Sequence, residues 1–176
     1  MAKDNTKTIN APSPWVARFA AELPIGGSII DIACGSGRHT RLLVDQGHQV
    51  IAVDRDLAAA QDLANFDAVE LLNYDLESGT WPFPPESAAG IIVTNYLHRP
   101  HFKRLYETLA IDGLLIFETF AVGNERFGRP RNPDFLLKPG ELLEAFGDHL
   151  EIIAYEEAEE TLPKPAFKQR ICARKK

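Results

Sequence analysis

The sequence predicts an α/β three-layer sandwich, in which a mostly parallel β-sheet lies between two layers of helices. Strand and helix signals alternate along most of the 176 residues, as in βαβ units. The first strand signal ends in a glycine-rich turn that leads into a helix signal, over residues 29–47. The last two strand signals are separated by a charged, turn-forming segment, residues 156–165. These features predict a single domain over residues 12–176.

The expected elements follow from the spacing of apolar residues. Trp15, Phe19 and Leu23 recur at helical intervals, which predicts an amphipathic helix over residues 14–22. Further helices are expected near residues 38–47, 57–64, 100–110 and 139–147. Seven strands are expected, near residues 28–33, 49–53, 68–72, 90–95, 112–120, 150–155 and 167–173.

Proline and glycine indicate where several of these elements begin and end. Pro100 is expected to start the helix of residues 100–110, and Gly113 to stop it. Pro139 opens the helix of residues 139–147. Residues 79–85, Gly-Thr-Trp-Pro-Phe-Pro-Pro, predict a rigid loop instead of another helix.

Composition restricts the class of protein. Apolar content of 45% and charged content of 25% are ordinary for a soluble domain, and no apolar run approaches the roughly 20 residues that cross a bilayer. Residues 1–11 are polar, are expected to form a mobile tail, and lack the hydrophobic segment of a secretory signal. Two cysteines are too few for a disulfide framework and do not form a metal-ligand pair. We therefore expect a cytoplasmic protein with no metal and no membrane partner.

The net charge of −6 bears on nucleic-acid binding. It argues against a protein that coats nucleic acid over a broad basic face. A local basic groove stays open as an alternative, so a nucleic-acid partner is disfavoured and not ruled out. The sequence says nothing about the oligomeric state.

The most informative stretch is residues 29–40, Ile-Ile-Asp-Ile-Ala-Cys-Gly-Ser-Gly-Arg-His-Thr. Gly35 and Gly37 carry no Cβ, so the backbone can turn sharply and come close to a ligand. A strand–turn–helix unit of this kind presents free backbone N–H groups. The carboxylate of Asp31 would repel a pyrophosphate and suits a ligand with a positive amino group. This favours S-adenosylmethionine (SAM) over NAD.

Asp31-Ile-Ala-Cys-Gly-Ser-Gly37 resembles the first motif of the class I SAM-dependent methyltransferases. The resemblance covers residues 26–173. Within this family the chain is loosely similar to small stand-alone bacterial enzymes of the tellurite-resistance and thiopurine types. It implies a Rossmann-like seven-stranded sheet that closes in an antiparallel C-terminal hairpin. It also implies that the motif binds the methionine part of SAM, through Asp31, Ala33, Cys34, Gly35 and Gly37.

Carboxylates also end the second and third expected strands. Two ribose hydroxyls need a paired acceptor at a strand end, and Asp54, followed by Arg55, is expected to supply it. Asp56 is the competitor, since it also fits a helix N-cap. The resemblance implies that Asp75 accepts from the adenine amino group and that Leu76 packs on the ring. The alternative is that Asp75 caps a turn.

The fourth expected strand ends in polar and aromatic residues. In-line methyl transfer needs alignment and, for many acceptors, a base, so Tyr96 and His98 are the catalytic candidates. The alternative for His98 is a local hydrogen bond to the backbone. Asn95 is expected to bind near the sulfonium. Thr94-Asn-Tyr-Leu97 stands where many enzymes that methylate exocyclic or amide nitrogens have Asn-Pro-Pro-Tyr, which lowers the case for a nucleobase amine or glutamine acceptor.

The long segment 120–138 is expected to bend around Phe127 and Phe135, which would wall a substrate pocket. Arg126, Phe127 and Arg129 are the substrate candidates, because a guanidinium is shaped to bind a carboxylate or phosphate. The alternative is that the arginines pair with acids of the surface, such as Glu125 and Asp134.

Taken together, the sequence predicts methyl transfer from SAM to a small acceptor that is anionic or aromatic. The alternatives are an RNA or protein methyltransferase, an NAD-binding oxidoreductase, and a SAM-binding protein without turnover.

Overall fold

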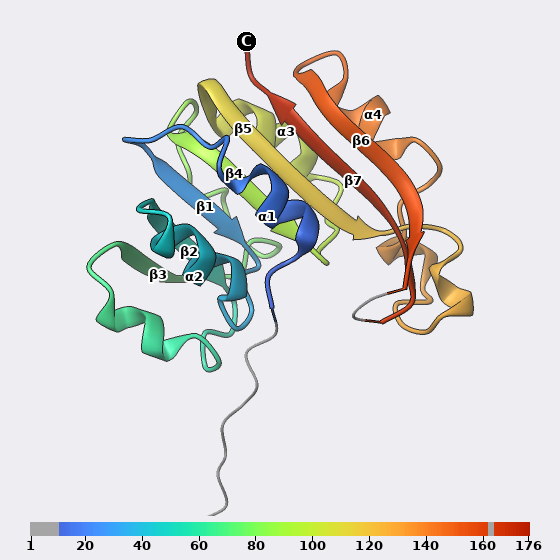
Figure 1. The fold of residues 1–176 in the computed structure, drawn as a ribbon, viewed down its shortest axis with the longest axis horizontal. Helices are drawn as coiled ribbons and strands as arrows, with labels where there is room; N and C mark the ends of the chain where they lie inside the picture. The colour runs from blue at the N-terminus through green and yellow to red at the C-terminus, as the bar shows by residue number, and fades with distance from the viewer. Residues whose placement is uncertain (1–10, 162–163) are drawn as a thin grey trace, which may run out of the picture.

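The computed structural model describes residues 11–161 and 164–176 (Figure 1). The predicted mobile tail, residues 1–11, lies outside the described residues except for Ala11. Seven strands form one sheet in the order β3-β2-β1-β4-β5-β7-β6. Their bounds are Ser28–Ile32 (β1), Gln49–Asp54 (β2), Val69–Asn73 (β3), Ala88–Thr94 (β4), Leu109–Phe120 (β5), Glu151–Glu160 (β6) and Ala166–Arg174 (β7).

The pairing of these strands confirms the predicted fold class. Strands β1 to β5 pair in parallel, whereas β7 is antiparallel to both β5 and β6. The chain therefore ends in an antiparallel hairpin at one edge of a mostly parallel, Rossmann-like sheet. The strand order reverses beside β1 and β4, and in such sheets ligands bind outside the carboxyl ends of the strands at this point.

Helices cover both faces of the sheet. The helices α1 (Pro14–Ala20) and α2 (Arg38–Asp45) lie in front of it in Figure 1, and α3 (His101–Thr108) and α4 (Glu141–Phe146) lie behind it. Three short 3-10 helices lie in the connections: η1 (Gln61–Asn65), η2 (Asn124–Arg126) and η3 (Pro133–Phe135). No helix in the described part of the chain is long and apolar enough to span a membrane.

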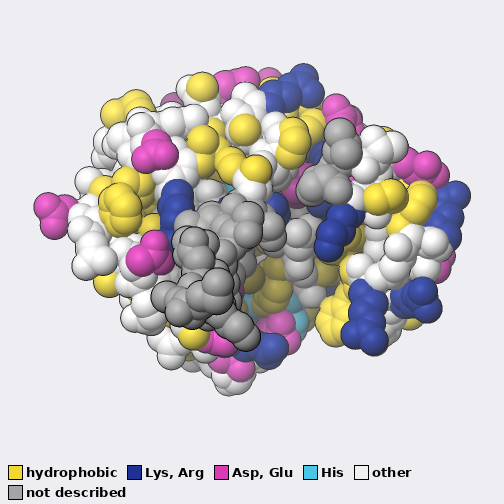
Figure 2. All heavy atoms as spheres, turned by 60° about the horizontal axis from the view of Figure 1, so that its bottom comes forward, with side chains coloured by type: hydrophobic (Ala, Val, Ile, Leu, Met, Phe, Trp, Pro, Cys, Tyr) yellow, Lys and Arg dark blue, Asp and Glu magenta, His cyan; other side chains and the backbone are white. Residues whose placement is uncertain are grey.

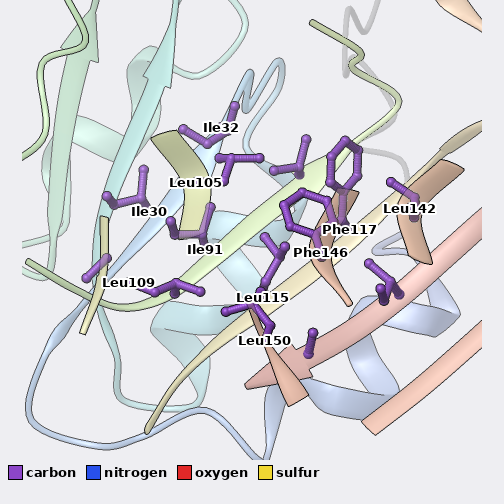
Figure 3. Close-up of a cluster of buried hydrophobic side chains, with 14 of the residues drawn as sticks. Ile30, Ile32, Ile91, Leu105, Leu109, Leu115, Phe117, Leu142, Phe146 and Leu150 are labelled. Atoms are coloured by element: carbon purple, nitrogen blue, oxygen red, sulfur yellow. The ribbon is translucent and has the colours of Figure 1, made fainter. Parts of the chain in front are cut away.

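Two apolar clusters join these layers. Alternate residues of β5 point to opposite faces: Leu115 and Phe117 belong to one cluster, Leu114 and Ile116 to the other. Figure 3 shows the first cluster, in which strand residues meet Leu105 of α3 and Leu142 and Phe146 of α4. All of these side chains are buried, as expected for a sheet covered on both sides.

The prediction of a helix over residues 57–64 is wrong. Residues 58–60 form turns, and the only helical part is η1. The reason lies in the spacing of three between Leu57, Ala60 and Leu63, all of which are buried in one cluster. This spacing matches the three residues per turn of a 3-10 helix, not the 3.6 of an α-helix.

The prediction that Gly113 stops the helix of residues 100–110 is also wrong. Helix α3 ends at Thr108, and β5 begins at once, with Leu109 opposite Ala88. The pairing shifts before Leu114, so residues 110–113 bulge out of register. A Cβ on Gly113 would lie 2.7 Å from the carbonyl oxygen of Ala110. Glycine is therefore needed inside this strand for close packing, and does not end a helix here.

The final hairpin is longer than predicted. Strand β6 continues to Glu160, through residues expected to form a turn. Glu156 and Glu160 both form ion pairs with Arg170 on β7. Opposite charges across the two strands thus extend the pairing into a segment whose own composition favours a turn.

Candidate functional site

A cleft of about 300 Å³ lies beyond the carboxyl ends of β1, β2, β3 and β4. Five of the predicted cofactor-binding residues border it, namely Ala33, Asp54, Arg55, Asp75 and Leu76. Four further residues complete its lining: Tyr74, Glu77, Tyr96 and Phe135. The structure therefore brings together, at one edge of the sheet, residues that the sequence places after three different strands.

The turn between β1 and α2 contains two glycines whose surroundings differ. Gly37 has φ +75°, and a Cβ there would lie 2.3 Å from Cδ1 of Leu63, so the protein's own packing excludes a side chain. Gly35 has φ +57°, and a Cβ there would meet nothing within 4 Å. Gly35 is therefore open on the side where a ligand could approach the backbone. Neither glycine is among the residues that line the cleft.

Asp54 ties the glycine turn to the end of β2. Its two carboxylate oxygens accept the backbone N–H groups of Gly35, at 2.9 Å, and of Asp56, at 3.0 Å. The carboxylate of Asp56 instead accepts the N–H of Ala58, at 2.9 Å. The two acids thus have separate roles: Asp54 faces the cleft, and Asp56 caps the following turn.

Asp31 and Cys34 lie beneath the turn and do not border the cleft. Asp31 is 1% exposed, and one of its oxygens accepts the hydroxyl of Thr40, at 2.7 Å. The other, Oδ1, has no hydrogen-bond partner among the described residues. Burial raises the pKa of Asp31 to about 6. A buried carboxylate with one free oxygen is suited to accept from a donor that a ligand or water brings. Burial also raises the pKa of the Cys34 thiol, which favours its neutral form.

After β3 the chain forms the floor of the cleft. Leu76 is 7% exposed, whereas Asp75 is exposed and accepts the backbone N–H of Glu77 at 3.0 Å. Asp75 thus does cap a turn, as the alternative interpretation held, and still borders the cleft. Sequence reasoning missed Tyr74 and Glu77. Tyr74, an aromatic residue next to a predicted ligand residue, was a usable signal, whereas Glu77 resembles any solvated acid.

A second cleft of about 250 Å³ adjoins the first, because both are bordered by Glu77, Tyr96 and Phe135. Its other lining residues are Asn95, Leu97, Thr119, Phe120 and Pro130. Asn95 borders the second cleft and not the first, and it has a left-handed backbone with φ 53°. Its predicted contact near the sulfonium stays a prediction. Ala33, on the first cleft, has φ 52°. Figure 2 looks onto this face, where hydrophobic, acidic and histidine side chains meet in a hollow.

The two predicted catalytic residues differ in position. Tyr96 borders both clefts, and its hydroxyl has no hydrogen-bond partner among the described residues. Burial, together with the Glu77 carboxylate, raises the pKa of Tyr96 well above its usual value, so the phenol keeps its proton. His98 borders neither cleft. Its Nδ1 lies 3.9 Å from Oε2 of Glu77, and its ring lies 4.3 Å from that of His101.

Segment 121–138 is fixed in place by buried polar contacts. Asn124, which is 1% exposed, accepts the N–H of Phe167 at 3.1 Å and donates to the carbonyl of Pro130 at 3.3 Å. Ala121 pairs with Leu137 in an isolated parallel bridge. The segment borders the second cleft through Phe135, as expected, and through Pro130, whereas Phe127 does not border it. Asn124 was not identified from the sequence, because nothing in its neighbourhood distinguishes a buried amide from a loop residue.

The predicted substrate residues lie away from both clefts. Arg126 forms an ion pair with Glu159 at 2.5 Å, donates to the carbonyl of Gly123, and lies over the ring of Phe127. Neither Arg126, Phe127 nor Arg129 borders the first or the second cleft. For Arg126, the structure thus has the surface ion pair of the alternative interpretation, with Glu159 as the acid. Anion binding by these residues stays a prediction.

Comparison with known families supports the resemblance stated for the sequence. The model of the family described as "Methyltransferase domain" matches residues 29–113, from β1 into β5. A curated relative, the putative methyltransferase YqeM of Bacillus subtilis, is 28% identical over 116 residues. The match covers 59% of this chain and 47% of the relative, so the chain spans about half the length of that protein.

Solved structures share the fold over nearly the whole chain. TehB from Haemophilus influenzae is similar with a TM-score of 0.74 and 20% identity, covering 91% of this chain and 61% of that one. The Burkholderia thailandensis 1,6-didemethyltoxoflavin-N1-methyltransferase, solved with 1,6-didemethyltoxoflavin and S-adenosylhomocysteine, has a TM-score of 0.71 and 19% identity, covering 92% and 76%. At these identities the likeness establishes the fold alone.

Proposed function

We propose that the chain is a class I SAM-dependent methyltransferase that transfers the methyl group of SAM to a small organic acceptor. One observation carries this proposal: two clefts adjoin at the carboxyl edge of the sheet and share Glu77, Tyr96 and Phe135. Predicted cofactor residues border the first cleft, and the second has a mainly apolar lining. A donor in one and an acceptor in the other would meet at the shared residues.

The residues of the first cleft fit SAM. Asp54, at the end of β2, would accept from the ribose hydroxyls, and Arg55 lies beside it. Asp75 would accept from the adenine amino group while the buried Leu76 packs against the ring. Gly35 leaves room for a close approach of the methionine part, and the free Oδ1 of Asp31 suits its positive amino group.

SAM supplies an electrophilic methyl group on a sulfonium, so the protein's main task is alignment. Tyr96 keeps its proton and would donate a hydrogen bond to a reactant at the junction of the clefts. Tyr96 is therefore suited to orient a reactant and not to remove a proton. His98 borders neither cleft but lies beside the Glu77 carboxylate, so it would receive a proton by way of Glu77.

The second cleft favours a small acceptor with an aromatic or otherwise apolar body. Its volume of about 250 Å³ suits a compound of one or two rings. Leu97, Phe120, Pro130 and Phe135 supply apolar walls. The Burkholderia thailandensis neighbour is named as a methyltransferase that acts at N1 of 1,6-didemethyltoxoflavin.

Calorimetry followed by a turnover assay tests the proposal. The protein should bind SAM and S-adenosylhomocysteine, and should not bind NADH. Incubated with SAM and a fractionated cell extract, it should release S-adenosylhomocysteine with the small-molecule fraction. Tight binding of NADH without SAM would indicate an oxidoreductase instead. Turnover confined to the RNA or protein fraction would give those acceptors, and SAM binding without any turnover would indicate a non-catalytic protein.

A further inference from the structure

The charge around the second cleft restricts the acceptor. Among the described residues that border this cleft, Glu77 alone has a charged side chain. The other polar groups are the amide of Asn95 and the hydroxyls of Tyr96 and Thr119. An anionic acceptor would therefore face a carboxylate with no cation on the wall of the cleft to balance it.

Two cations near the wall of this cleft are held by acids of their own, and Arg55 borders the adjoining first cleft, where it is assigned to the cofactor. Lys168 lies 5.2 Å from the ring of Phe120, but its ammonium is 3.1 Å from Glu160 and 3.5 Å from Glu118. The guanidinium of Arg99 forms a two-pronged contact with Glu141. Using either cation for a substrate would break an existing ion pair that is at least partly shielded from solvent, which opposes the binding of an anion.

On the basis of the proposed function, we infer that the acceptor is an uncharged aromatic compound whose N–H group donates a hydrogen bond to Glu77. Glu77 and Tyr96 border both clefts, so a group bound by them lies at the junction with the donor. A carboxylate only accepts hydrogen bonds and therefore selects a donor. The rings of Tyr96, Phe120 and Phe135 suit a flat apolar body.

The same contact orients the ring for reaction. In an azole the electron pair of the N–H nitrogen belongs to the aromatic system, so the nucleophile is a second, pyridine-type nitrogen of the ring. When the N–H points at Glu77, the in-plane electron pair of that second nitrogen points away from the carboxylate and is free to meet the methyl group. The N–CH₃ bond forms as the S–CH₃ bond breaks, and the electron pair of that bond stays on sulfur, giving neutral S-adenosylhomocysteine. The methylated ring then carries a positive charge and becomes neutral by giving its N–H proton to the Glu77 carboxylate. From Glu77, which is exposed and lies beside His98, the proton passes to solvent, directly or through His98.

Binding of matched probes tests this inference. The probes are benzimidazole, indazole and 7-azaindole, each compared with its N-methyl analogue and with an analogue carrying a carboxylate. Dissociation constants are measured by NMR titration at pH 7.5, with the protein saturated with S-adenosylhomocysteine. We expect the N–H compounds to bind about tenfold more tightly than the carboxylates, and more tightly than the N-methyl compounds.

Two variants locate the effect. Glu77→Gln should weaken binding of the N–H compounds about tenfold and reduce their advantage over the carboxylates, because the charge is lost. Glu70→Gln, at an exposed position of β3, should change neither. Thermal unfolding of both variants verifies that they fold.

The inference is overturned if the carboxylates bind as tightly as the N–H compounds, if Glu77→Gln leaves the preference intact, or if no N–H probe binds. These outcomes apply to protein that binds S-adenosylhomocysteine. Failure to bind S-adenosylhomocysteine itself would count against the proposed function, which separates the two failures.

Discussion

Arg99 and Glu141, 42 positions apart in the sequence, hold the wall of both clefts in place. The Nε and Nη2 atoms of Arg99 donate to the two carboxylate oxygens of Glu141, at 2.6 and 2.9 Å. The guanidinium also donates to the carbonyls of Asp134 and Leu136, each at 2.8 Å. These carbonyls flank Phe135, so one side chain fixes the backbone on both sides of the ring that borders the clefts.

Replacing Arg99 with lysine should loosen this wall. An ammonium cannot reproduce the planar, two-pronged contact and the two carbonyl contacts together, so we expect a loss of about 1–3 kcal/mol in the free energy of unfolding, measured with urea. Proteolysis within residues 121–138 should also become faster. Arg104→Lys, on the exposed side of α3 with only a 3.8 Å contact to Glu107, is the matched control and should change little. Equal stability of the two variants would contradict this role of Arg99.

The ionised carboxylate of Asp31, which is predicted to serve SAM binding, should destabilise the folded protein. Its carboxylate is 1% exposed with one oxygen unpartnered among the described residues, and burial raises its pKa from 3.8 to about 6. Ionised Asp31 therefore destabilises the fold at neutral pH. We expect Asp31→Asn to raise the free energy of unfolding at pH 7.5 by up to about 3 kcal/mol and to weaken SAM binding.

The gain in stability expected for Asp31→Asn should depend on pH. Between pH 6 and about 4 the folded state binds the Asp31 proton more tightly than the unfolded chain does, so acidification relieves the cost. The advantage of Asp31→Asn should thus shrink as the pH falls through this range. Asp67→Asn, at an exposed position, should show no such trend. A variant less stable than the wild type at pH 7.5 would refute the prediction.

The two glycines of the turn should respond differently to alanine. Both have positive φ, so each substitution carries a backbone cost of about 1 kcal/mol. Gly37→Ala adds a clash with the buried Leu63, for which we expect a further loss of about 1–3 kcal/mol. Gly35→Ala meets open space, so it should mainly weaken S-adenosylhomocysteine binding. Urea unfolding and calorimetry distinguish the two, and similar losses of stability in both variants would contradict the packing argument.

Local patterns in the sequence were enough to predict the sheet and the first cleft. An apolar run predicts a strand, parallel strands align their carboxyl ends, and so Ala33, Asp54 and Asp75 could be placed at one edge before the structure was known. The failed elements are those whose form depends on partners distant in the sequence. Residues 57–64 form turns and a 3-10 helix because their apolar residues are buried at intervals of three. Glu160 lies in a strand because it forms an ion pair with Arg170 of the neighbouring strand.

The residues of the second cleft could be predicted only in part, for the same reason. Asn95 and Tyr96 follow a strand and were expected at the site. Phe135 was expected to wall a pocket, but its place in the middle of a long loop depends on contacts that the local sequence does not show. Arg99 contacts the loop from outside it, and Asn124 within the loop accepts from the backbone of Phe167 on β7. Glu77 was missed because no local pattern distinguishes an acid at the junction of two clefts from an acid on the surface.

Glu118 forms the centre of a buried charge network between β5 and β7. It is 2% exposed, with Oε2 accepting from Nε of Arg170 at 3.1 Å and Oε1 lying 3.5 Å from Nζ of Lys168. Glu118→Gln should leave these two cations with less negative charge around them, because only Glu160 and the outlying Glu156 remain. We expect a loss of about 3 kcal/mol in the free energy of unfolding. Glu156→Gln, whose contacts to Arg170 and Arg18 are more exposed, should cost less than about 1 kcal/mol.

The response of Glu118 to pH tests whether the loss arises from charge or from packing. Burial alone would raise the pKa of Glu118, but Lys168, the Ser13 hydroxyl and Arg170 outweigh it and hold the pKa below the ordinary 4.5. A carboxyl with a lowered pKa in the folded state stabilises the fold above its ordinary pKa, and this contribution disappears as the pH falls through the folded value. The difference in the free energy of unfolding between wild type and Glu118→Gln should therefore be constant from pH 8 to about 5 and should disappear at lower pH. A gap that persists in acid would show that the glutamine disturbs packing and that the charge contributes little.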